Sequence, residues 1–321
     1  MTTAPASATS SDRRTRRWTA ADVPDLTGRR ALVTGANSGI GAVQARVLAE
    51  HGADVVLAAR RPEAARAVAD RISASGAPGA VSVEELDLAS LDSVRALAAR
   101  LEGPLHLLVN NAGVMAPPRR RETVDGFELQ FGTNHLGHFA LTGLLLPRLL
   151  EAPAARVTTV SSLAHFSSDG RVAEGNPPDD YDPQTSYGRS KLANLLFATE
   201  LHRRTQEPGS PLATIASTAA HPGVSNTRLF SSRDGMGALA VVRLLAPVVG
   251  RVVLASPERG AEAVLNAATV APAGAYIGPT WLGGSRGPVG EVGRSPWGAD
   301  ADLARLLWDR SEELTGVRYP A

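Results

Sequence analysis

Residues 31–41 read ALVTGANSGIG, and this stretch decides the fold class. A run of small and β-branched residues (31–34) ends in a glycine-rich turn, and the helix-period segment GAVQARVLAEHG (41–52) follows. A strand that ends in glycines and opens a helix is typical of the first unit of a dinucleotide-binding fold. The glycines Gly35, Gly39 and Gly41 could also end the strand for steric reasons alone, so the interpretation depends on the rest of the chain.

The alternation of strand and helix continues along the chain. The segments ADVVLAAR (53–60), VSVEELD (81–87), LHLLVNNAG (105–113) and ARVTTVSS (155–162) each precede a helical stretch. Such alternation predicts parallel strands joined by right-handed crossovers. We therefore predict an α/β fold with a doubly wound parallel sheet (Rossmann fold), in a single domain over residues 26–321. Residues 1–25 are expected to form a disordered tail, and residues at about 229–256 a small helical substrate lid.

Composition excludes several classes of function. The 33 basic and 32 acidic residues leave a formal charge of +1, which gives no reason to expect a nucleic-acid partner. Cysteine is absent, which excludes disulfides, thiolate metal sites and a cysteine nucleophile. His135, His138, His165 and His221 lack metal-ligand spacing, so we expect no metal. The apolar stretch at 237–256 is interrupted by arginine and proline, so we expect no membrane span and a cytoplasmic location. A homo-oligomer is a separate expectation.

Several further motifs follow the glycine loop in a fixed order. They are NNAG (110–113), Asn134 within FGTNHLGHF, the serine pair 161–162, YGRSK (187–191) and HPGVSNT (221–227). With the glycine spacing GxxxGxG, they resemble the short-chain dehydrogenase/reductase superfamily over roughly residues 26–280. The stretches PDLTGRRALVTGANSGIG, TNHLGHF and YGRSKLANLLF are most similar to the retinol-dehydrogenase-like reductases and their bacterial relatives.

The end of the second strand indicates the cofactor. A site for NAD places a carboxylate there for the ribose 2′-hydroxyl, whereas a 2′-phosphate requires a cation. The chain has Arg60 and Arg61 at this point and no carboxylate before Glu63, which predicts NADP(H). The alternative is that both arginines are merely solvated.

The resemblance implies the remaining cofactor contacts. They are Gly35, Asn37, Ser38, Gly39, Ile40, Gly41, Asp87, Leu88, Asn111, Ala112, Gly113, Tyr187, Lys191, Pro222, Gly223, Val224 and Thr227. Asn111 could instead serve to tie adjacent strands together, and both roles can hold.

Tyr187 and Lys191 form the predicted catalytic pair. They are four residues apart on a helical segment, so they share a face, and Lys191 is the only lysine among 33 basic residues. We expect the ammonium group to lower the pKa of the phenol. The resemblance adds Ser162, rather than Ser161, to hold the substrate oxygen, and Asn134 to anchor a water that leads protons to Lys191. Asn134 could alternatively be a core residue with its hydrogen bonds satisfied.

These residues predict an NADP(H)-dependent oxidoreductase that interconverts a carbonyl and an alcohol on a small molecule. The apolar composition of the lid favours a lipophilic substrate, although it equally suits a core or a subunit contact. Residues 163–186 exceed the usual loop of the family and are expected to lie over the site. The alternatives are reduction of an activated C=C bond and a non-catalytic NADP-binding sensor or scaffold.

Overall fold

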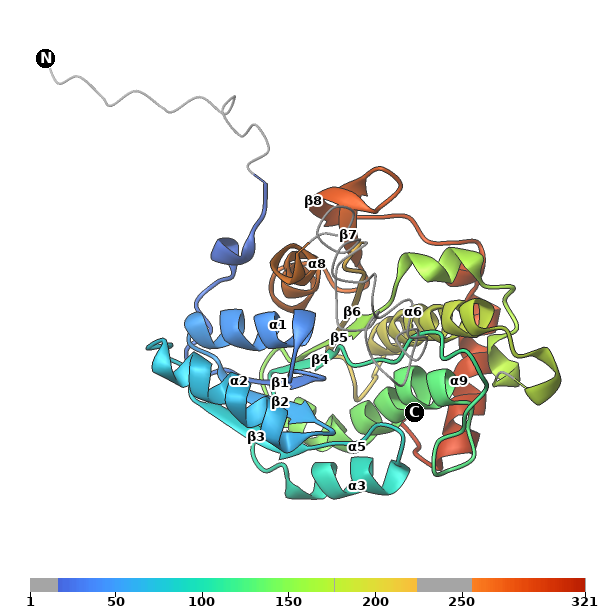
Figure 1. Ribbon diagram of the computed structural model, residues 1–321, viewed down its shortest axis with the longest axis horizontal. Helices are drawn as coiled ribbons and strands as arrows, with labels where there is room; N and C mark the ends of the chain where they lie inside the picture. Colours follow the sequence, from blue (N-terminus) through green and yellow to red (C-terminus); the bar gives the residue numbers. More distant parts are fainter. Residues whose placement is uncertain (1–16, 176, 224–255, 321) are drawn as a thin grey trace, which may run out of the picture.

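A parallel sheet forms the centre of the computed structural model, which describes residues 17–175, 177–223 and 256–320. Its eight strands lie in the order β3-β2-β1-β4-β5-β6-β7-β8 (Figure 1). All neighbours pair in parallel except β7 and β8. The strands are β1 (Arg30–Thr34), β2 (Asp54–Ala59), β3 (Val81–Glu85), β4 (Leu107–Asn110), β5 (Arg156–Val160), β6 (Ala216–Ala220), β7 (Tyr276–Trp281) and β8 (Arg286–Glu291).

Helices cover both faces of the sheet (Figure 1). One layer contains α1 (Gly39–Glu50), α2 (Pro62–Ala74) and α8 (Pro257–Thr269). The other contains α3 (Leu91–Arg100), α5 (Gly137–Glu151), α6 (Pro183–Thr205) and α9 (Ala301–Thr315). A short helix α4 (Leu129–Phe131) and a π-helix η2 (Gly132–Leu136) lead directly into α5.

Alternation along the central strand explains the two layers. Ala31 and Val33 of β1 belong to the apolar cluster beneath α1, α2 and α8, whereas Leu32 belongs to the cluster beneath α3, α5 and α6. Successive side chains of a strand point to opposite faces, so a strand that is apolar throughout must be covered on both sides. The predicted doubly wound sheet is thereby confirmed.

Five elements lie beyond those predicted from the sequence: β6, α8, β7, β8 and α9. β8 has the sequence RGPVGE, whose two glycines and proline do not favour a strand, and it pairs with β7 as an antiparallel hairpin. The helix α9 packs on α6, where the guanidinium of Arg204 stands 4.4 Å from the ring centroid of Trp308.

The predicted disordered tail is wrong for residues 17–25. Trp18 packs against the apolar cluster under α1 and α8, and Val23 is buried there. Arg17 forms an ion pair with Glu262 of α8 at 2.7 Å. These anchors fix the segment, because apolar burial and a partly buried charge pair offset the entropy of ordering it. A short 3-10 helix, η1 (Ala20–Asp22), lies between them.

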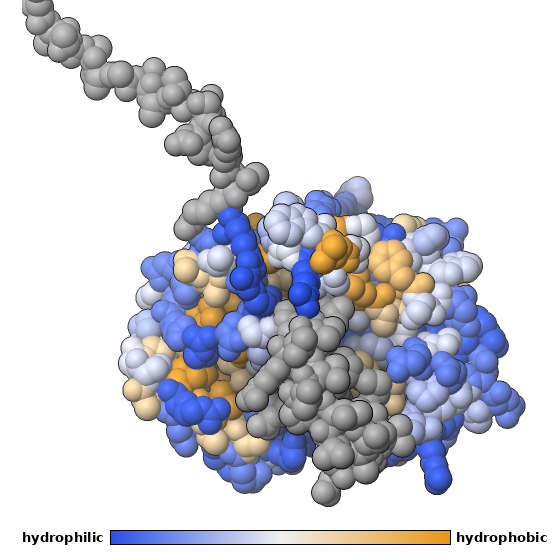
Figure 2. Space-filling view, turned by 45° about the horizontal axis from the view of Figure 1, so that its top comes forward, coloured by the Kyte–Doolittle hydropathy of each residue, from blue (hydrophilic) through white to orange (hydrophobic). Residues whose placement is uncertain are grey.

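The surface is mainly polar on the face shown in Figure 2, where apolar residues form separate patches. No helix among the residues described is long and apolar enough to cross a membrane. The predicted lid at 229–256 lies outside the described residues except for its final position, Ser256, which caps the start of α8.

Candidate active site

The glycine-rich turn between β1 and α1 is shaped for close approach by a ligand. Gly35 and Gly39 have φ values of +68° and +57°, a region that glycine adopts without strain. A side chain on Gly41 would meet Gly35 O and the amide of Asn111, each at 2.6 Å. Ser38 precedes α1, and its side chain caps no N–H group among the described residues. The N-terminus of α1 therefore offers backbone donors to an anion. Asn37 and Ile40 complete the turn.

A buried hydroxyl organises the floor behind this turn. Thr34 Oγ1 accepts hydrogen bonds from the backbone N–H groups of Asn111 and Ala112, both at 2.9 Å. Asn111 Nδ2 in turn donates to Thr34 O at 2.8 Å, so Asn111 does tie β1 to the end of β4. Sequence reasoning missed Thr34, which precedes the glycine loop and has no polar neighbour in β1 to draw attention to it.

The end of β2 carries the predicted phosphate cations. Arg60 and Arg61 are both exposed, directly after β2 and directly before α2. Asp87 and Leu88 follow β3 at the same edge of the sheet; Leu88 is buried, and Asp87 Oδ1 accepts from the N–H of Ala89 at 3.0 Å. The structure thus brings together, at the carboxyl ends of neighbouring strands, the groups predicted to hold the adenosine part of the cofactor.

Asn134 lies in the π-helix η2, fully buried. Its side chain accepts from Val114 N at 2.7 Å and donates to Val114 O and to Ser190 Oγ, both at 2.9 Å. Its backbone carbonyl lies 2.9 Å from His138 Nδ1. The side chain therefore joins the end of β4 to α6, as a satisfied core residue would, and its predicted role as a water anchor stays a prediction.

The phenol of Tyr187 is buried beside Ser162. A hydrogen bond from the Ser162 hydroxyl is the one influence that lowers the pKa of Tyr187, but burial outweighs it and raises this pKa to about 12. Ser162 also caps the 3-10 helix η3 (Leu163–Ser167). Ser161, by contrast, donates to Lys191 O at 2.7 Å and is taken up by that contact. The structure thus brings Ser162, and not Ser161, to the phenol.

Lys191 occupies the same face of α6 as Tyr187, with its Nζ 5.8 Å from the centroid of the phenol ring. Nζ donates to Val160 O at 3.1 Å, and burial lowers its pKa to about 8. A side chain on Gly113 would stand 3.4 Å from this Nζ, so Gly113 leaves space beside the ammonium. The expected lowering of the Tyr187 pKa by Lys191 is wrong for the chain alone, because desolvation of the phenol dominates.

A small apolar box surrounds the Tyr187 ring. Met115 and Ala116 are buried against it, and Ala164 packs at its edge. Ala116 has a φ of +45°, a strained value for a residue with a side chain, and its N–H donates to Gln130 Oε1 at 2.7 Å. Sequence reasoning missed both residues, and the two prolines after Ala116 give no signal of this conformation, because a residue before proline favours extended backbone.

The turn after β6 completes the site as far as the structure describes it. Pro222 and Gly223 follow the buried His221, and the N–H of Gly223 lies 3.2 Å from His221 Nδ1. The φ of Gly223 is +66°, and a side chain there would meet Ser285 O at 2.6 Å. Val224 and Thr227, also predicted to contact the cofactor, lie outside the described residues.

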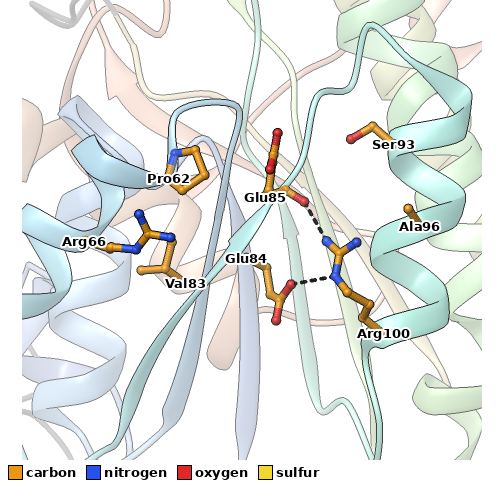
Figure 3. Close-up of a pocket in the computed structure, with 8 residues that line it drawn as sticks. All are labelled: Pro62, Arg66, Val83, Glu84, Glu85, Ser93, Ala96 and Arg100. Atoms are coloured by element: carbon orange, nitrogen blue, oxygen red, sulfur yellow. Dashed lines mark hydrogen bonds and ion pairs between the residues drawn. The ribbon is translucent and has the colours of Figure 1, made fainter.

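A cavity of about 460 Å³ lies at the edge of the sheet rather than at the phenol. Its lining comes from α2, β3 and α3 (Figure 3), and comprises Pro62, Arg66, Val83, Glu84, Glu85, Ser93, Ala96 and Arg100. Arg100 crosses it to bind the Glu84 carboxylate and the Glu85 carbonyl, each at 3.1 Å. These charges protect an exposed edge strand from pairing with another chain. None of the predicted catalytic residues lines this cavity.

Comparison with known protein families shows which family this chain belongs to. The family model described as short chain dehydrogenase matches residues 29–236. The chain belongs to the short-chain dehydrogenase family. As a member of this family it is an oxidoreductase, and the predicted resemblance is confirmed.

Relatives of this short-chain dehydrogenase include both mammalian and bacterial proteins. It is 40% identical to polyprenol dehydrogenase of Mus musculus, covering 92% of this chain and 86% of the relative. It is 37% identical to retinol dehydrogenase 13 of Homo sapiens, covering 92% and 87%. A crystal structure of an uncharacterized protein from Mycobacterium paratuberculosis has 42% identity and a TM-score of 0.78, over 95% of this chain and all of that one. The RhlG/NADP active-site complex from Pseudomonas aeruginosa has 29% identity and a TM-score of 0.57, over 76% and 90%.

The residues present in this short-chain dehydrogenase fit a nicotinamide dinucleotide. The turn at Gly41 has no room for a side chain, and the backbone donors of α1 face the space that a pyrophosphate would need. Near Tyr187, the buried ammonium of Lys191 donates one N–H to Val160 O, and its other N–H groups remain for a cofactor. A proton donor, a charge and a hydroxyl therefore stand together at the carboxyl edge of the sheet.

Proposed function

We propose that this protein is an NADP(H)-dependent oxidoreductase that interconverts a carbonyl and an alcohol on a lipophilic small molecule. The observation that carries the proposal is the buried group of Ser162, Tyr187 and Lys191, in which the phenol accepts a hydrogen bond from the Ser162 hydroxyl and shares a helix face with an ammonium. An oxygen that gains negative charge during reduction needs a proton donor within hydrogen-bond reach.

The protonation states suit reduction. Because burial raises the pKa of Tyr187 to about 12, the phenol is protonated at neutral pH and can give its proton to the substrate oxygen. Ser162 would orient that oxygen, and Lys191, charged below its pKa of about 8, would stabilise the phenolate left behind. NADP(H), when bound, supplies or takes up the hydride. The glycine turn, Asp87, Leu88, Asn111, Ala112, Gly113 and Gly223 would hold it.

The choice of NADP(H) rests on Arg60 and Arg61, and it is supported by the related RhlG structure, which is an NADP complex. Changing Arg60 to Asp places a negative charge where the 2′-phosphate would bind. NADPH should bind more weakly by about 1.5–3 kcal/mol, the scale of a hydrogen bond to a charged group, while NADH suffers less. Fluorescence titration with both nucleotides measures this, with Arg66→Asp on the next turn of α2 as the control. Equal use of NADH and NADPH by the wild type would refute the assignment.

The preference for a lipophilic substrate is supported by the apolar box around Tyr187 and by the names of relatives that act on polyprenol and retinol. A homologous series of alkyl ketones and aldehydes tests it. Each further buried methylene should contribute up to ~0.8 kcal/mol to kcat/KM. A flat series, or a preference for carboxylated substrates, would overturn this part of the proposal.

The decisive experiment is Tyr187→Phe, which removes the proton donor and keeps the ring. Turnover of a reducible carbonyl should fall by at least 10²-fold, while NADPH binding stays within about twofold of the wild type. If wild type and variant are equally inactive on every carbonyl and both bind NADPH, the sensor alternative is favoured. If enones are converted by both to saturated ketones, the reaction is C=C reduction and the assigned role of Tyr187 fails.

A further inference from the structure

Arg189 stands between the catalytic candidates on α6 but belongs to neither the cofactor nor the proton pathway described above. Its side chain is only 1% exposed, although guanidinium groups are rarely buried unless paired. Its Nε donates to Asp169 Oδ1 at 2.8 Å, and its Nη2 donates to Asp169 Oδ2 and, at 2.6 Å, to Asp180 Oδ2. The forked contact with Asp169 is the geometry that arginine, and not lysine, provides.

Both carboxylates come from the long segment between Ser162 and α6. We call residues 163–182 the wall segment; it contains η3, η4 (Val172–Glu174) and η5 (Pro178–Asp180), and lies beside the first half of α6 (Figure 1). Asp169 and Asp180 are 39% and 43% exposed, so Arg189 reaches them from the inside. A second arginine, Arg171, completes the cluster from the outside, binding Asp180 at 2.8 Å and Glu174 at 2.6 Å.

At its start the wall segment is anchored independently of Arg189, because His165 is fully buried and its Nε2 accepts a hydrogen bond from the N–H of Ser295 at 3.2 Å. The part around Asp169 and Asp180 has few buried side chains. The segment has only short 3-10 turns, and among its described residues Val172 is the buried aliphatic side chain, packed against Phe131 of α4. Such a polar segment would ordinarily be a mobile loop. Buried charge pairs with good hydrogen-bond geometry favour one conformation, although removing the charges from water costs free energy. Here Arg189 is the group that is removed from water.

The two ends of the wall segment touch the surroundings of the Tyr187 ring. At its start, Ala164 packs against that ring, and a side chain on Gly188 would meet Ala164 O at 2.8 Å. Near its end, the Tyr181 hydroxyl donates to Pro117 O at 2.7 Å, beside the strained Ala116 of the apolar box. A shift of the wall segment would therefore move two sides of the space in which a substrate meets the phenol.

We propose that Arg189 is a positioning residue that clasps the wall segment against α6 and so fixes one side of the substrate-binding space, setting the affinity and size selectivity for the carbonyl substrate. This role rests on the proposed function. It concerns the substrate rather than the cofactor or the proton transfer, because the contacts of Arg189 lie with Asp169 and Asp180 and not with the glycine turn or Lys191.

The test compares Arg189→Met, Arg189→Lys and Asp169→Asn with the control Arg203→Met. Arg203 lies on the same helix and pairs with Glu200 and Glu207, at 2.7 and 2.6 Å, away from the wall segment. In Arg189→Met we expect KM for a carbonyl substrate to rise at least tenfold, kcat to change less than threefold, and the Kd for NADPH to stay within twofold. Asp169→Asn, which keeps Arg189 paired with Asp180, should give a smaller rise, as should Arg189→Lys. The control should leave KM unchanged.

A second readout needs no turnover. Arg171 is the one trypsin site between residues 163 and 188, so cleavage of the Arg171–Val172 bond, followed by mass, reports whether the wall segment is held. This cleavage should accelerate at least tenfold in Arg189→Met and remain at the wild-type rate in the control. A wild type that turns over no carbonyl would defeat the proposed function, yet the cleavage rates would still test the clasp. Unchanged cleavage and KM in Arg189→Met would overturn the inference, as would a joint loss of kcat, NADPH binding and thermal stability in the two milder variants.

Discussion

At the scale of single residues, the spacing of Tyr187 and Lys191 was sufficient to place them on one helix face, but it could not give their pKa values. Period and spacing fix where side chains project, whereas the pKa depends on how much water the surrounding chain removes. The apolar neighbours Met115 and Ala116 come from a different segment, more than 70 residues earlier, and they exclude water from the phenol. The sequence therefore predicts the shared helix face correctly and the sign of the Tyr187 pKa shift incorrectly, and the catalytic roles of the pair stay predictions.

Lys191→Arg tests whether the ammonium is needed for more than its charge. A guanidinium is larger and planar, and it would have to fit the space beside Gly113 while still reaching Val160 O. We expect turnover of a carbonyl to fall by about 10²-fold or more, while circular dichroism shows that the fold is retained. Full activity in Lys191→Arg would contradict the role assigned to the lysine.

At the scale of elements, the strands up to β5 and the helices α1, α2, α3, α5 and α6 could be read from the sequence because each combines a consistent period with glycine or polar boundaries. The later elements could not. In β8 the glycines and proline hide a strand that exists because β7 supplies its partner. The contacts of Arg189 were equally hidden, because Asp169 and Asp180 lie 20 and 9 positions away and nothing in the chain pattern pairs them.

The joint between β1 and α1 gives a prediction at this scale. Gly41→Ala would bring a methyl group within 2.6 Å of Gly35 O, a backbone atom that cannot move without shifting the cofactor turn. We expect a loss of about 1–3 kcal/mol in the free energy of unfolding and a weaker NADPH complex. Urea unfolding and nucleotide titration measure the two effects. Gly76→Ala, at a position where a side chain meets nothing within 4 Å but where φ is +77°, separates strain from steric overlap.

At the scale of the whole molecule, the lysine and the tyrosines determine how the free energy of unfolding changes at alkaline pH. The chain has no cysteine and one lysine, whose pKa is lowered to about 8 by burial. All four tyrosines have pKa values raised by burial: Tyr181, Tyr187, Tyr276 and Tyr319. The cytoplasmic location, the homo-oligomer and the single domain stay predictions.

The signs of these shifts predict a maximum of stability. Between pH 8 and about 10 the unfolded chain keeps a proton on Lys191 that the folded chain has lost, so the free energy of unfolding rises with pH. Above about pH 10 the tyrosines of the unfolded chain lose protons that those of the folded chain retain, so the free energy of unfolding falls. Urea unfolding at a series of pH values, followed by tryptophan fluorescence, measures the curve. Lys191→Met should abolish the rise and keep the fall; parallel curves for both proteins would refute the assignment.

The solitary, 4% exposed lysine also determines how this protein can be handled chemically. Reagents that acylate amines therefore find no exposed lysine on the native fold. A protease specific for lysine has one bond to cut, after Lys191, and that bond lies inside α6. Cleavage there would split the chain into two fragments only after the helix opens, so the rate at which the fragments form would report the opening of the helix that carries Tyr187 and Lys191.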